Sequence, residues 1–286
     1  MTLVVALVVL LAAVTHASWN ALTHSIKDEL AALTLVGTGR AACGLVLVLF
    51  APLPPVGAWP YLGASVLVHI GYQLVLIRSF RLGDFGKMYP IARGTGPIVV
   101  TVFAMLFLNE RLHGWSALGA ALAAAGLVGL ALWGVRGESA RPHGWAVAAA
   151  VTTGLAIAAY TVVDGVGVRA CGPGDGFLGY VGWLMLLDGA SIPGWALVMR
   201  RGGLVGRIRP SLARGWAGGC LSVVAYGLVL WSQTRAQLAP VALLRESSIL
   251  VGAIIAKVFF KEPFGGPRLV AAGLMLVGIM LMLGVR

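Results

Sequence analysis

Residues 89–97 read Tyr-Pro-Ile-Ala-Arg-Gly-Thr-Gly-Pro and lead through an apolar run to Leu-Asn-Glu-Arg-Leu at 108–112. Residues 241–248 read Val-Ala-Leu-Leu-Arg-Glu-Ser-Ser and lead through a second apolar run to Lys-Glu-Pro-Phe at 261–264. In both stretches a glutamate lies 17 positions after the arginine. A charge at membrane depth costs free energy and usually serves a function. Its repetition at matched positions indicates a duplicated transporter.

The composition is that of a protein with several membrane spans. Hydrophobic residues make up 59% of the chain and charged residues 11%, whereas soluble domains average about 25% charged residues. The net charge of +11 does not indicate nucleic-acid binding, because most of the basic residues lie in short loops between apolar runs, where they suit anionic lipid. The three cysteines show neither metal-binding spacing nor a disulfide framework, so we expect no metal and no cofactor.

Ten apolar stretches reach the roughly 20 residues that a membrane span requires. The first has no basic leader, so we interpret it as a span and not as a cleaved signal. Five helices per repeat place the repeats in opposite orientations. We therefore predict an all-α membrane protein with ten transmembrane helices in two inverted five-helix repeats, 1–136 and 137–286, within one membrane domain. The predicted spans are 3–22, 31–50, 59–79, 87–108, 115–134, 143–164, 176–199, 213–234, 240–260 and 267–285.

Basic residues are divided unevenly between the two sides of this topology. Most of them fall on one side, including the arginine-rich segment 200–214, and few fall on the other, among them Arg111 and Arg169. The positive-inside rule places the basic side in the cytoplasm and both termini outside.

Several motifs, taken in order, resemble the EamA type of drug/metabolite transporter, in a bacterial branch. They are His16-Ala-Ser-Trp-Asn20, Gly83-Asp84, Tyr89-Pro-Ile-Ala-Arg93-Gly, Asn109-Glu-Arg-Leu112, Leu244-Arg-Glu-Ser247 and Lys261-Glu-Pro-Phe264. The resemblance implies a multi-pass protein of the bacterial inner membrane that exports or imports small metabolites by alternating access. It also implies that both termini are cytoplasmic, opposite to the charge count.

Arg93 and Arg245 are the leading candidates for substrate binding, because a guanidinium can grip a carboxylate or phosphonate through two hydrogen bonds. We predict that they face a central cavity from opposite sides of the membrane midplane. Extension of Arg93 to the nearer headgroups is the alternative. Glu246 is predicted to lie about 100° around the helix from Arg245, so the two should not share one narrow face. Glu246 is compatible with binding a substrate ammonium, carrying a proton or neutralising an arginine.

Polar and aromatic residues form two further stripes with helical spacing, and either stripe can line a cavity or serve packing. Tyrosine and tryptophan rings in them could hold a substrate ammonium by cation–π contact. The candidates are His16, Trp19 and Asn20 on the first span, His69, Tyr72 and Gln73 on the third, and Tyr89, Tyr160 and Tyr226 elsewhere.

Asp188 and Asp164 join Glu246 as candidates for proton coupling. Asp188 lies near the middle of its span, and without a partner it would be protonated. Asp164 lies near a predicted helix end, where solvation is the alternative. Glu110 and Glu262 end their helices, and we predict that each ties down a loop or caps a neighbouring helix.

These features favour a secondary active transporter of a small polar or zwitterionic metabolite, amino-acid-like or aminophosphonate-like. A proton or solute gradient would drive it, because the sequence has no phosphate-binding loop for ATP. An exporter of cationic or quaternary-amine compounds is the alternative. A membrane-embedded enzyme is less supported, since no nucleophile motif or paired catalytic carboxylates occur. We expect a monomer or homodimer in the lipid bilayer, with a small-molecule substrate and no nucleic acid.

Overall fold

The computed structural model describes residues 1–82, 85–112, 114–136, 144–199, 206, 208–259 and 266–284, and the regular elements in them are helices. This confirms the all-α prediction. The α-helices are α1 (Leu3–His24), α2 (Glu29–Phe50), α3 (Trp59–Leu82), α4 (Phe85–Phe107), α5 (Trp115–Arg136), α6 (Gly144–Ala170), α7 (Gly176–Met199), α9 (Leu212–Gln233), α10 (Leu238–Arg245), α11 (Ser247–Phe259) and α12 (Gly266–Gly284). Two short 3₁₀ turns, Val56–Ala58 and Arg209–Ser211, precede α3 and α9.

Helices suit a bilayer because every backbone N–H and C=O inside a helix is satisfied within the segment. Among the described residues, α1, α2, α6, α7 and α9 are long and apolar enough to cross a membrane. Three shorter apolar segments are Ile91–Phe107, Trp115–Gly129 and Val270–Leu283. Large apolar side chains such as Leu49 and Phe50 are exposed, as contact with lipid would require.

The predicted spans match these helices closely, with two corrections. The sixth span does not end at 164, because α6 continues to Ala170 and the chain turns only afterwards, where Gly172 and Gly174 have positive φ values. The predicted span 240–260 is not one helix, because α10 ends at Arg245 and α11 begins at Ser247.

The chain divides into two compact units. Unit 1 comprises residues 1–7, 67–162 and 235–286, and it contains α4, α5, α10, α11 and α12. Unit 2 comprises residues 8–66 and 163–234, and it contains α2, α7 and α9. Each unit draws on both halves of the sequence. The division follows contacts in space, so the repeats 1–136 and 137–286 stay a prediction.

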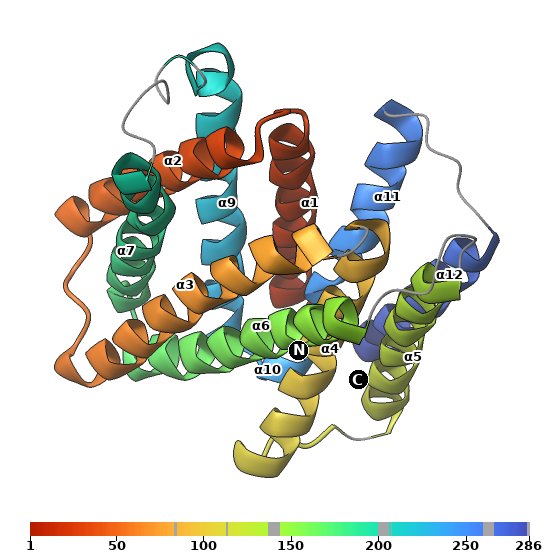
Figure 1. The fold of residues 1–286 in the computed structure, drawn as a ribbon. Helices are drawn as coiled ribbons and strands as arrows, with labels where there is room; N and C mark the ends of the chain where they lie inside the picture. The colour runs from red at the N-terminus through yellow and green to blue at the C-terminus, as the bar shows by residue number, and fades with distance from the viewer. Residues whose placement is uncertain are drawn as a thin grey trace. The chain divides into compact units, whose positions relative to one another are not determined.

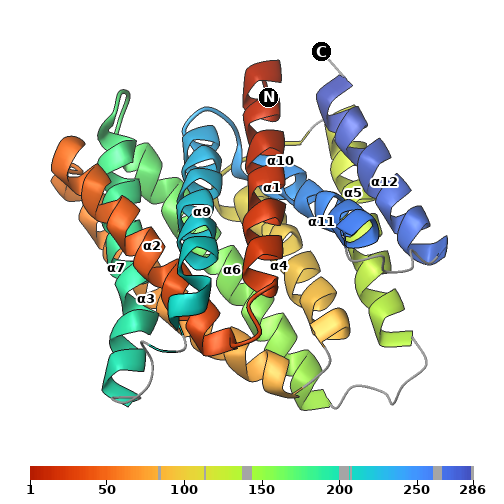
Figure 2. The ribbon, with the colours of Figure 1, turned by 90° about the horizontal axis from the view of Figure 1, so that it is seen from above.

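In unit 1, helices α5 and α12 pack closely through small residues, and they lie side by side in Figures 1 and 2. A Cβ added to Gly126 would lie 2.7 Å from the carbonyl oxygen of Ala271, and one added to Gly119 would lie 2.5 Å from that of Gly278. The earlier glycine of α5 meets the later residue of α12, so the two helices run antiparallel. Antiparallel packing of matched helices is the arrangement expected of inverted repeats.

In unit 2, helix α2 packs closely against α7 in the same way (Figure 1). A Cβ on Gly37 would lie 2.7 Å from the carbonyl oxygen of Gly189, and one on Gly44 would lie 2.8 Å from that of Gly182. A core of larger side chains, including Tyr180, Leu184 and Met185, fills the rest of this unit. The glycines bring the backbones together, and this approach brings the polar groups on these helices within reach of one another.

Candidate functional site

The break between α10 and α11 in unit 1 carries a buried cluster of three charged residues, Arg93, Arg245 and Glu246. Glu246 is fully buried, and the arginines are 6% and 5% exposed. Arg93 Nη2 lies 3.0 Å from Glu246 Oε2, and Arg245 Nε lies 3.5 Å from Glu246 Oε1. Arg93 Nη2 also donates a hydrogen bond of 2.9 Å to Ser248 Oγ at the start of α11. We call this group the Arg93–Glu246–Arg245 cluster.

This geometry bears on three expectations. Arg245 and Glu246 are in contact at the point where α10 ends, although adjacent positions of a regular helix lie about 100° apart. Both arginines lie against one carboxylate, and their approach from opposite sides of a membrane midplane stays a prediction. Arg93 does not extend toward headgroups, since it is buried and paired with Glu246. Neutralisation of the arginines by Glu246 agrees with the structure.

Glu110 caps the other end of α10. Its Oε1 accepts a 2.7 Å hydrogen bond from the backbone N–H of Leu238, and its Oε2 accepts one of 3.1 Å from Ala239. These are two of the N–H groups that a helix N-terminus leaves without an internal partner. The prediction that Glu110 caps a neighbouring helix is confirmed. Glu262 lies outside the described residues.

An aromatic group also lies in unit 1. The rings of His69 and Tyr160 stack with centroids 4.1 Å apart, and Tyr72 meets Tyr160 edge-on at 5.5 Å. His69 and Tyr160 are buried, whereas Tyr72 and Gln73 are half-buried. The structure therefore brings Tyr160 of the sixth span against His69 and Tyr72 of the third. The side chain of Tyr89 lies outside the described residues.

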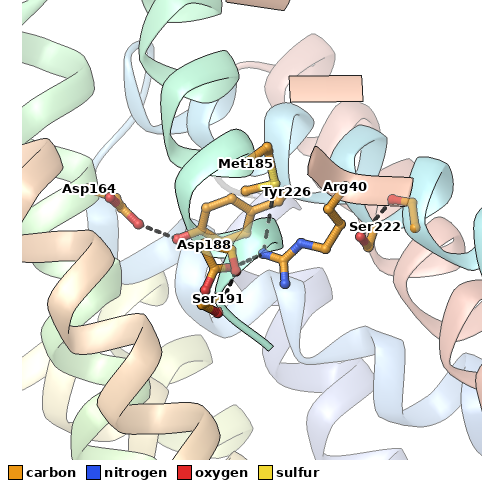
Figure 3. Close-up of polar contacts among 8 residues, drawn as sticks. Arg40, Asp164, Met185, Asp188, Ser191, Ser222 and Tyr226 are labelled. Carbon is orange, nitrogen blue, oxygen red and sulfur yellow. Dashed lines mark hydrogen bonds and ion pairs between the residues drawn. The ribbon is translucent and has the colours of Figure 1, made fainter. Parts of the chain in front are cut away.

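Unit 2 contains a second group of buried charges (Figure 3). Arg40 on α2 reaches across to α7, where its Nη2 lies 2.5 Å from Asp188 Oδ2 and 3.8 Å from Met185 Sδ. The Asp188 side chain is fully buried, and that of Arg40 is 20% exposed. Asp188 has a cation from another helix as its partner, so the case of a buried carboxylate without a partner does not arise.

Asp164 is buried and not solvated, since α6 continues past it to Ala170. Its Oδ1 accepts a 2.8 Å hydrogen bond from the hydroxyl of Tyr180, and its Oδ2 accepts one from Tyr226. Figure 3 shows the Tyr226 hydroxyl pointing at Asp164. Tyr226 thus belongs to a polar group of unit 2.

The polar stripe on α1 is held by local hydrogen bonds. Trp19 Nε1 donates to His16 Nδ1 over 3.3 Å, and Asn20 Nδ2 donates to the backbone oxygen of His16 over 3.0 Å. The three side chains are half-buried and lie in unit 2. The shared face predicted for them is confirmed, and a role in binding stays a prediction.

Sequence reasoning missed three residues of these groups: Arg40, Tyr180 and Ser248. Arg40 gave a usable signal, because it is a charge inside an apolar span. Tyr180 and Ser248 gave none, because a tyrosine or a serine in a membrane helix is common and only the fold shows what it contacts.

The fold and these groups define a helical membrane protein with charged side chains buried inside its helix bundles. Residues 3–132 match the EamA-like transporter family, which confirms the resemblance seen in the sequence motifs. An uncharacterized transporter in the cobO 3' region of a Sinorhizobium species is 33% identical over 79 residues, which are 28% of this chain and 55% of that protein. The match thus spans about half the length of this curated relative.

A protein of known crystal structure shares the fold. The two superpose with a TM-score of 0.70 over 97% of this chain and 96% of the other, at 17% sequence identity. At this identity the likeness supports the helical architecture alone.

Proposed function

We propose that the protein is a secondary active transporter of the EamA type in the inner membrane of a bacterium. It carries a small polar or zwitterionic metabolite by alternating access, linked to a proton or solute gradient. The anionic end of the substrate binds at Arg93 and Arg245. Glu246, Asp188 and Asp164 are the carboxylates available for proton coupling.

The observation that carries the proposal is the Arg93–Glu246–Arg245 cluster at a helix break. Transporters commonly bind substrates where a membrane helix is discontinuous, because the break releases backbone and side-chain groups into the bundle. The cluster is buried, so its charges are not ordinary solvated surface charges. Charges inside a membrane helix bundle usually serve a function. The antiparallel pairs α5 with α12 and α2 with α7 add support, since inverted repeats underlie alternating access in many transporters.

Transport is tested with purified protein in proteoliposomes. We expect saturable uptake of an amino acid or aminophosphonate that depends on an imposed pH gradient. Arg93→Gln and Arg245→Gln should each abolish uptake while the protein still reaches the membrane. Arg209→Gln is the matched control, because Arg209 is exposed in a 3₁₀ turn outside both charged groups.

Uptake at the wild-type rate by both cluster variants would contradict the proposed site. An exporter of cationic compounds is the second candidate, and the carboxylate of Asp164 between two tyrosines favours it. Gradient-driven flux of quaternary amines, without flux of amino acids or aminophosphonates, would favour that candidate. Product formation without flux would indicate an enzyme instead.

A further inference from the structure

Arg245 has buried N–H groups for which the described residues provide no hydrogen-bond acceptor. Its Nε and Nη2 have no hydrogen-bond partner in that part of the chain, although the residue is only 5% exposed. Nε lies 3.5 Å from Glu246 Oε1 without the geometry of a hydrogen bond. Buried donors are nearly always paired in folded proteins, so two of them on one arginine indicate a ligand site.

These two atoms lie on one edge of the guanidinium plane. This edge presents two parallel N–H groups, the geometry that binds both oxygens of a carboxylate or phosphonate. Arg93 is engaged differently, because its Nη2 contacts Glu246 and donates to Ser248. Arg93 therefore holds Glu246 and the start of α11. On the edge of Arg245, Nε has only the 3.5 Å contact with Glu246, and Nη2 has no hydrogen-bond partner among the described residues.

We infer that Arg245 is the docking point for a single anionic group, a carboxylate or a phosphonate monoanion, and that Arg93 positions Glu246 beside it. The inference rests on the proposed transport function and deepens it, because it gives the two arginines separate roles. It also predicts selectivity: the site accepts monoanions and zwitterions through their acidic group and rejects cations.

The inference is tested by isothermal titration calorimetry of the full chain in detergent, with probes that each have a five-carbon chain and differ in the charged groups that the chain carries. We expect binding of pentanoate and of the zwitterion norvaline, and none of pentyltrimethylammonium. Arg245→Lys should weaken binding by about tenfold or more, because an ammonium lacks the two-donor edge. Arg209→Lys is the matched control, and it should leave the affinity unchanged, because Arg209 is exposed outside the cluster. Arg93→Lys should weaken binding less than Arg245→Lys does, by about threefold, since a lysine can keep the contact with Glu246.

Circular dichroism and size-exclusion chromatography establish that each variant is folded before its affinity is compared. Binding of pentyltrimethylammonium in place of both acids would overturn the inference, as would an Arg245→Lys variant with wild-type affinity. The measurement requires no flux, so the two proposals can fail separately. Acid binding without flux in proteoliposomes would contradict transport alone, and flux without acid binding would contradict the anion site alone.

Discussion

Individual charged residues in this protein are stabilised by partners on other helices. Arg40 and Asp188 contact each other from α2 and α7, and Asp164 accepts hydrogen bonds from Tyr180 and Tyr226. A carboxylate moved from water into an apolar interior loses several kcal/mol of solvation, and only a close partner offsets this loss. Each such contact therefore depends on the packing that brings its two helices together.

Asp188→Asn tests the dependence of Arg40 on its partner. The substitution keeps the shape of the side chain and removes its charge, which leaves Arg40 without its ion pair. We expect the free energy of unfolding to fall by about 3 kcal/mol, measured from thermal unfolding in detergent. The double variant Arg40→Met with Asp188→Leu should recover much of this loss, because no charge is then buried. A single variant as stable as the wild type would show that the ion pair contributes nothing.

At the scale of helices, glycines decide which pairs approach closely. Gly44 lies against α7, and a Cβ at this position would lie 2.4 Å from the backbone nitrogen of Leu186. A backbone atom cannot move aside as a flexible side chain can, so even one methyl group would push the two helices apart. Gly63 on α3 differs, because nothing lies within 4 Å of a Cβ added there.

Gly44→Ala and Gly63→Ala therefore form a matched pair of variants. Gly44→Ala should lower the free energy of unfolding by about 2 kcal/mol, because it overpacks the α2–α7 contact. Gly63→Ala should leave stability unchanged or raise it by up to about 1 kcal/mol, because alanine favours helix formation more than glycine. Thermal unfolding in detergent measures both. Equal melting temperatures for the two variants would mean that close α2–α7 packing is not needed for stability.

For the whole molecule, the distribution of charge predicts the orientation in the membrane. Most arginines and lysines lie on one side of the predicted topology, which the positive-inside rule assigns to the cytoplasm. The termini would then lie outside, whereas the family resemblance implies that they lie inside.

Reporter fusions at both termini distinguish these orientations. If both termini lie outside, as the charge count predicts, alkaline phosphatase fused to either end should be active in a bacterial host. A fluorescent protein fused there should not fluoresce. The physical reason is that phosphatase folds only after export, where its disulfides form. Bright fluorescence at both ends would show that the orientation follows the family and not the charges.

The sequence by itself determined most of the helices and the resemblance to the EamA-like transporter family, whose model matches residues 3–132. Apolar runs of about 20 residues identify membrane spans without any tertiary contact, because span length follows from bilayer thickness. It also identified Arg93, Arg245, Glu246 and Asp188 as costly charges, because their positions within apolar runs are visible in the chain. The position of Glu110 at the end of a predicted span indicated a capping role. The sequence did not show that the helix it caps is α10.

Only the tertiary structure decided which charges meet. Periodicity placed Arg245 and Glu246 on different faces of one helix, and it missed the break between α10 and α11, where the two residues are in contact. It gave Asp188 no partner, because Arg40 lies far away in the chain and reaches it only when glycines let α2 and α7 pack. Local patterns report the cost of burying a charge, whereas the groups that offset this cost depend on contacts between distant segments.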